Sequence, residues 1–158
     1  MADPNNRYGL TAARTHERPG KEVRPRSLTV DIHSHAQVPS AAECAKPHLK
    51  PDPRASVYTE ETRILTRKQD EDRMPNLLDL GLRMRDFDAM GVDAQVISPA
   101  PAQCYYTVPA QVGIEAARLV NEGIAAISAK APQRIPAAMG SVPMQAGGEA
   151  AAANWNTQ

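Results

Sequence analysis

Short segments with the alternation of a β-strand are separated along this chain by longer segments with the periodicity of an α-helix. Strands are predicted near residues 28–35, 92–98 and 135–142. Helices are predicted between these strands, near residues 77–91 and 109–130. A strand, a helix and another strand in succession favour parallel pairing with right-handed crossovers. This order therefore limits the fold to the α/β class.

The residue pattern within each segment supports these predictions. In the first segment, Leu28, Val30 and Ile32 alternate with polar residues, as in a short strand. The first predicted helix has apolar residues three or four positions apart and ends at Gly91, a residue favoured just after a helix. Its apolar residues are Leu77, Leu80, Met84 and Phe87. Such spacings gather the apolar side chains of each segment on one face.

Three strands with two helical crossovers match the opening of a (β/α)8 barrel, or part of an open doubly wound sheet. No glycine-rich G-x-G-x-x-G turn follows any of the strands, which argues against a dinucleotide site. The alternation by itself leaves both architectures open.

The chain is expected to have a polar leader followed by one domain. Residues 1–27 lack hydrophobic periodicity and are predicted to be flexible. Residues 28–158 form the expected domain. Within it, residues 36–75 contain repeated prolines and many charged residues. This segment is predicted to be a long loop, either functional or disordered.

Composition excludes several classes of partner. The formal net charge is zero, so there is no electrostatic reason to expect nucleic acid or an anionic membrane. No apolar run approaches the roughly 20 residues that span a bilayer. Cys44 and Cys104 lie far apart without C-x-x-C spacing. They are expected to be structural thiols in a protein of the reducing cytoplasm.

The first predicted strand ends in a metal-like motif, Val30-Asp-Ile-His-Ser-His35. Residues two positions apart in a strand point to the same side, so His33 and His35 could bind one ion. Neutral imidazole is a good ligand for Zn²⁺. Two nearby histidines on a surface loop are an equally common explanation, because an H-x-H motif alone is weak evidence. The position at the end of a strand favours the metal site.

Four blocks of sequence resemble one branch of the amidohydrolase superfamily, which includes aminocarboxymuconate-semialdehyde, γ-resorcylate and 5-carboxyvanillate decarboxylases. The first block is the H-x-H motif, and the second is Arg85-Asp-Phe-Asp-Ala-Met-Gly-Val-Asp-Ala-Gln-Val-Ile-Ser-Pro99. The third is Ala117-Arg-Leu-Val-Asn-Glu-Gly123, and the fourth runs from Ala131 to Met144. Together they cover most of residues 28–149, in the family's order.

The resemblance implies the N-terminal part of a (β/α)8 TIM barrel, with about three parallel strands and a barrel that is not closed. It implies a metal-dependent decarboxylase or hydrolase that acts on a carboxylated, aromatic or muconate-type small molecule. His33 and His35 match the first two ligands of a divalent metal, zinc or else manganese. A homodimer is also expected, since the family commonly dimerises.

The sequence departs from the family pattern in its later part. The family's remaining metal ligands and catalytic partners are later histidines and an aspartate, but no histidine follows His48. We therefore expect a truncated chain that is inactive alone, with catalytic residues expected beyond residue 158. The alternative is a non-catalytic binding or assembly module that uses an exposed barrel edge.

Four other residues are candidates for substrate binding. Ser98 ends the second predicted strand and is expected at the barrel mouth, although such turns also use serine for ordinary hydrogen bonds. Arg63, Arg67 and Arg73 lie in the predicted loop, where one of them could pair with a substrate carboxylate. A solvated surface charge is the alternative for each arginine. Asp31 could support a ligand histidine or turn away from it.

Overall fold

The computed structural model describes residues 28–51 and 56–148. Contacts divide them into a sheet unit, residues 28–51 and 93–148, and a helical unit, residues 56–92. The predicted leader and the last ten residues lie outside the described residues. The sheet unit contains β1 (Val30–Ala36), α2 (Pro39–Ala45), η1 (Lys46–His48), β2 (Ala94–Pro99), η3 (Pro101–Cys104), α5 (Ala110–Lys130), β3 (Ala137–Ala138) and η4 (Met144–Ala146). The helical unit contains α3 (Glu60–Leu78) and α4 (Leu80–Met90).

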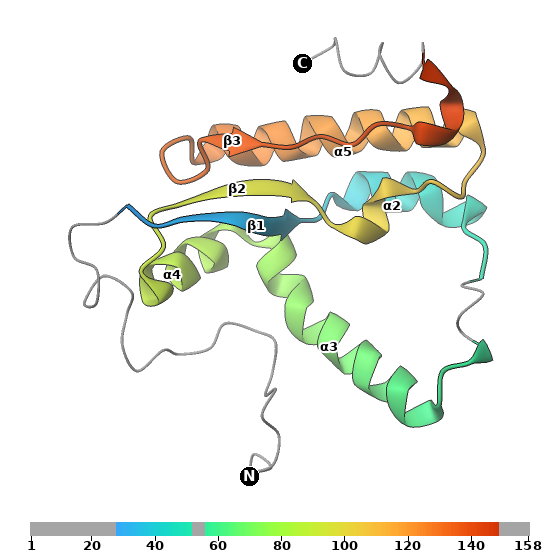
Figure 1. Cartoon of the computed structure of the whole chain (residues 1–158), viewed down its shortest axis with the longest axis horizontal. Coiled ribbons are helices and arrows are strands. Elements are labelled where there is room, and N and C mark those ends of the chain that lie inside the picture. Colours follow the sequence, from blue (N-terminus) through green and yellow to red (C-terminus); the bar gives the residue numbers. More distant parts are fainter. Residues whose placement is uncertain (1–27, 52–55, 149–158) are drawn as a thin grey trace. The chain divides into compact units, whose positions relative to one another are not determined.

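The sheet has three parallel strands in the order β1-β2-β3 (Figure 1). The predicted α/β class and the parallel pairing are therefore confirmed. β3 is much shorter than the predicted segment 135–142, because the chain soon leaves the ladder. The Met139 N–H still donates to the carbonyl of Ile97 at 2.8 Å, but the backbone of Ser141 pairs with the side chain of Asn121 instead.

An irregularity in β1 sets which side chains share a face of the sheet. Asp31 lies opposite Gln95 and Ser34 lies opposite Ile97, so β1 has one extra residue between these pairs. Such a bulge reverses the alternation of side chains beyond it. Ser34 consequently joins Asp31 on the face of Gln95, and both side chains bond to that glutamine.

The two faces of the sheet differ in burial. The face that contains Gln95 and Ile97 is buried. The opposite face, here called the open face, contains Val30, Val96, His35, Ser98 and Met139, as the strand register requires. Val30 and Met139 are exposed there, and Val96, His35 and Ser98 are half-buried. The apolar alternation of the first segment therefore does not place all its residues in a core.

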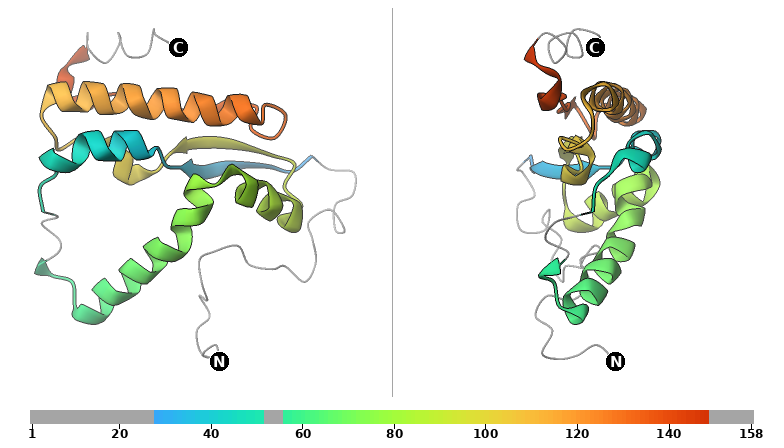
Figure 2. Two further views of the ribbon diagram at one scale, coloured as in Figure 1. Left: turned by 180° about the vertical axis from the view of Figure 1, so that it is seen from behind. Right: turned by 90° about the vertical axis from the view of Figure 1, so that its right-hand side faces the viewer.

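α5 covers part of the sheet unit and confirms the helix predicted near residues 109–130. It packs against α2 and runs along β2 and β3, as two further views show (Figure 2). Its buried residues include Ala116, Val120 and Ile124, which follow the helical repeat. Gly123 permits a close approach to the chain before α2, because a Cβ there would lie 2.6 Å from a Val38 methyl carbon.

Two buried amide side chains each form a pair of hydrogen bonds with the backbone of a loop residue, as a neighbouring strand would. The Oε1 atom of Gln103 accepts from the Val38 N–H, and its Nε2 donates to the Val38 carbonyl, both at 2.7 Å. In the same way, the Oδ1 atom of Asn121 accepts from the Ser141 N–H at 2.7 Å, and its Nδ2 donates to the Ser141 carbonyl at 3.0 Å. These bonds satisfy buried backbone groups where no ladder is available.

The prediction of a long loop over residues 36–75 was wrong, because α2, η1 and most of α3 lie within it. The prolines that suggested a loop occupy positions where a helix tolerates proline. Pro39 lies in the first turn of α2, where a missing N–H costs nothing. The hydroxyl of Thr59 caps α3 by accepting from the Thr62 N–H at 3.3 Å. No residue of α3 is buried, so its sequence lacks the apolar stripe that usually marks a helix.

The helix predicted near residues 77–91 is in fact the end of α3 followed by α4. Asp79 is extended (φ −96°, ψ 109°), which breaks the helical path, and its carboxylate caps α4 by accepting from the Leu82 N–H at 2.9 Å. Gly91 ends α4 in the left-handed conformation (φ 67°), as predicted. None of the described helices combines the length and apolar character needed to cross a membrane.

Candidate metal centre

His33 and His35 lie side by side near the carboxyl end of β1. Their ring centroids are 5.2 Å apart and the rings are nearly perpendicular, at 88°. The register shift falls between Asp31 and Ser34, an interval that includes His33, and the two rings nevertheless lie next to each other. His33 is exposed and His35 is half-buried. The two imidazoles therefore meet at the carboxyl end of a parallel strand, where α/β proteins usually bind ligands.

The hydrogen bonds of His35 fix its tautomer. Its Nδ1 atom lies 2.9 Å from Ser98 Oγ and 3.2 Å from the carbonyl oxygen of Pro99. A carbonyl can only accept, so Nδ1 carries the proton. The Ser98 hydroxyl donates its own hydrogen to the Ser34 carbonyl at 3.2 Å, which leaves its oxygen to accept from Nδ1. The lone pair of the ring is then on Nε2, the arrangement that a metal ligand needs.

The spacing of the two rings fits a shared zinc ion. Two imidazoles that bind one tetrahedral zinc at about 2.0–2.1 Å have ring centres roughly 5 Å apart, which agrees with the observed 5.2 Å. Within the described ranges, no group of three or more His, Cys, Asp or Glu side chains is arranged to hold a metal. This part of the chain thus offers two donors, fewer than the three protein ligands of a typical catalytic zinc site.

Ser98 and Asp31 both serve the histidine pair, in different ways. Ser98 lies directly opposite His35 in the sheet and holds its imidazole, an orienting role that the sequence did not indicate. Asp31 lies on the other face, where its Oδ2 accepts from Gln95 Nε2 at 2.7 Å. Its Oδ1 accepts from the backbone N–H of His33 at 3.0 Å. Asp31 therefore supports the backbone of the bulge rather than a ring.

Sequence reasoning missed two glutamines that follow the strand ends. Gln37 comes directly after β1 and Gln145 lies in η4, after β3. In the described part of the chain, the Oε1 atom of each is buried and has no hydrogen-bond partner. A buried polar atom without a partner is costly, and it often marks the place of a bound ligand or water. Their position after the ends of strands was the one signal present in the sequence.

The pKa of Tyr105, which follows η3, is raised. Burial of the phenol is the main cause, because it disfavours the charged form. The Gln103 amide, which donates to the Tyr105 hydroxyl at 3.4 Å, opposes this effect. Tyr105 therefore remains a neutral phenol through the physiological range.

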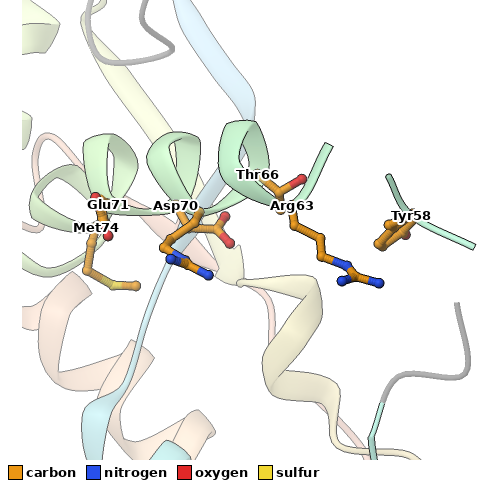
Figure 3. A pocket seen from close by; sticks show the side chains of 7 residues that line it. Tyr58, Arg63, Thr66, Asp70, Glu71 and Met74 are labelled. Atoms are coloured by element: carbon orange, nitrogen blue, oxygen red, sulfur yellow. The ribbon is translucent and has the colours of Figure 1, made fainter. Parts of the chain in front are cut away.

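The three candidate arginines lie on α3, in the helical unit. Arg63 and Arg67 line an open groove of about 450 Å³ together with Tyr58, Thr66, Asp70, Glu71 and Met74 (Figure 3). Arg63 pairs with Glu60 at 3.4 Å, and Arg73 pairs with Asp70 one turn earlier. Both pairs are exposed, so each contributes little to stability. The arginines thus belong to a helix face rather than to the predicted loop, while the histidines belong to the sheet unit.

Comparison with known proteins adds no family assignment. No protein-family model matches the chain, and no curated protein matches it.

Proposed function

We propose that this chain supplies the first three strands and the first two metal ligands of a metal-dependent carbon–carbon lyase (decarboxylase) or hydrolase with a (β/α)8 barrel. The substrate would be a carboxylated aromatic or muconate-type small molecule. His33 and His35 would hold the ion, zinc or else manganese. The observation that carries the proposal is the pair of contacts from His35 Nδ1 to Ser98 and Pro99, because a proton held on Nδ1 puts the lone pair of the ring on Nε2, the atom that would bind a metal.

The order and direction of the strands support this reading. Parallel strands in the order β1-β2-β3 are what the opening of such a barrel requires. The histidines lie on the open face, which would become the interior of a complete barrel. The four blocks of sequence that resemble the decarboxylase branch also follow one another in the expected order.

In this proposal each residue has a defined task. Ser98 and the Pro99 carbonyl hold the proton on His35 Nδ1 and fix the plane of the ring. Asp31 holds the backbone of His33 through its N–H. When bound, a divalent metal supplies a Lewis acid that orients a carboxylate and lowers the pKa of bound water. Gln37 Oε1, which is buried at the end of β1, could accept a hydrogen bond from substrate or water.

The experiment is a binding titration with zinc-loaded protein at low chain concentration. A hydroxybenzoate should bind at least about tenfold more tightly than acetate, because its ring adds apolar contact on the open face. Phenol, which has the ring but no carboxylate, should not bind. Binding should disappear in the His33→Ala, His35→Ala double variant and persist in His48→Ala, whose histidine is exposed in η1.

The same preparations give a test of turnover. We expect no CO₂ release from carboxylated phenols or aminocarboxymuconate semialdehyde with the 158-residue chain alone, because two imidazoles are too few ligands for a catalytic zinc. Equal binding of hydroxybenzoate by the double variant would contradict the proposed function. Metal-dependent turnover that the double variant loses would instead contradict our count of the ligands.

An assembly module is the second candidate, and one observation favours it. Leu28 and Ile32 are 76% and 71% exposed, although they alternate with polar residues as core strand residues do. Exposed apolar side chains grouped on one strand commonly mark an interaction surface.

A further inference from the structure

The histidine pair offers two of the donors that a zinc site needs. Zinc in structural sites is almost always bound by four protein donors in a tetrahedron. His33 and His35 have the ring spacing of two such donors. The described residues of one chain offer no third His, Cys, Asp or Glu beside them. The missing donors must therefore come from outside this part of the chain.

The surface around the histidines is apolar and exposed. Leu28 lies just before β1, Val30 and Ile32 precede the pair within it, and Met139 follows β3 on the open face. Leu28 and Ile32 are more than two-thirds exposed, and Val30 and Met139 are 42% and 49% exposed. Such residues together form an apolar surface on the order of a few hundred Å². A surface of this size next to an incomplete metal site fits a protein partner better than solvent.

We propose that two copies of this chain share one zinc ion, and that each copy supplies His33 and His35. A two-fold axis through the ion brings the same two donors from each copy, which completes a tetrahedral set of four imidazoles. The apolar residues beside the histidines then face each other across the axis. In this complex zinc has no open position, so it is a structural ion that joins the copies.

The metal is required for this dimer. A stable protein–protein interface buries about 800 Å² on each partner, and the apolar surface beside the histidines is smaller than that. Association should consequently follow zinc occupancy and reverse when zinc is removed. The inference uses the zinc binding of the proposed function but none of its chemistry.

The test is light scattering coupled to size exclusion, with zinc content measured on the same peak. At chain concentrations on the order of 10 µM, the mass should double on addition of about one zinc ion for every two chains. A chelator should return the chain to a monomer. His33→Ala and His35→Ala should each remove the dimer and the bound zinc, while His48→Ala should leave both unchanged. Circular dichroism checks folding, and the exposed His33 makes its variant the safer one.

A pair of charge variants tests the surface itself. Ile32→Asp adds a carboxylate beside the histidines and should weaken the dimer at least about tenfold. Val57→Asp adds the same charge at a residue that is 76% exposed in the helical unit, and it should have no effect. A monomer that binds one zinc ion per chain would overturn the shared site and leave the proposed function standing. A chain that binds no zinc would overturn both.

Discussion

Replacement of Ser98 by alanine should weaken zinc binding without disturbing the fold. The hydroxyl of Ser98 accepts from Nδ1 of His35 at 2.9 Å and donates to the Ser34 carbonyl at 3.2 Å. Ser98→Ala removes both bonds. The Nδ1 hydrogen of His35 then loses one of its two acceptors, and the carbonyl of Pro99 remains to fix the tautomer and the plane of the ring.

The size of the effect follows from these contacts. Loss of a group that orients a metal-binding histidine typically costs about 10-fold to 100-fold in metal affinity. The lower figure applies here, because the Pro99 carbonyl still accepts from Nδ1 at 3.2 Å. We therefore expect zinc affinity to fall about tenfold for each histidine pair, which corresponds to about 1.4 kcal/mol of binding free energy. If two copies share the ion, both copies lose the bond and the loss approaches about a hundredfold.

The assay is competition for zinc against a chromophoric chelator. Ser128→Ala is the matched control, because the Ser128 hydroxyl donates to the Ile135 carbonyl at 2.7 Å but contacts neither histidine. Both variants should lose about 1 kcal/mol of unfolding free energy, and only Ser98→Ala should lose zinc affinity. Ser98→Thr, which keeps the hydroxyl, should restore most of it. An unchanged dissociation constant in Ser98→Ala, or an equal loss in Ser128→Ala, would refute the orienting role.

Two further predictions concern the loop after β2. Gln103→Ala should lower the free energy of unfolding by about 3 kcal/mol in a urea titration, because the buried backbone N–H and carbonyl of Val38 both lose their bonds to the Gln103 amide. The control variant Gln111→Ala, at an exposed residue, should change the free energy of unfolding by less than about 0.5 kcal/mol, and equal effects of the two variants would contradict this account. The raised pKa of Tyr105 makes the folded state hold its proton more tightly than the unfolded state, whose phenol titrates near 10.0. Stability from this residue is therefore complete below about pH 10 and is lost as the pH rises through the folded pKa, so urea unfolding should show a smaller alkaline loss in Tyr105→Phe than in the parent chain.

Local pattern was sufficient for much of the sheet unit. The alternation of apolar residues and the helical stripe of α5 depend on neighbours within a few positions, and both are written in the sequence. They predicted parallel strands near residues 92–98 and a helix near 109–130, which β2 and α5 confirm. The left-handed Gly91 was equally readable, because glycine adopts a positive φ without a steric penalty.

Local pattern failed in the helical unit because α3 buries nothing. An exposed helix needs no apolar stripe, and a segment with many charged residues and no such stripe is predicted to be a loop. The prolines were misleading for a related reason. Pro39 in the first turn of α2 and Pro75 inside α3 are tolerated, while a sequence rule treats proline as a break.

The sequence by itself indicated the two candidate metal ligands, and the tertiary structure decided how their side chains are held. The two-residue spacing of His33 and His35 was enough to predict neighbouring rings, because a strand repeats every two residues. The partnership of His35 with Ser98 joins residues 63 positions apart, and it exists because parallel pairing brings β1 and β2 into one register. The extra residue between Asp31 and Ser34 is likewise a property of the pairing. It sends Asp31 and the histidines to opposite faces, since a bulge reverses the alternation that sequence alone can count.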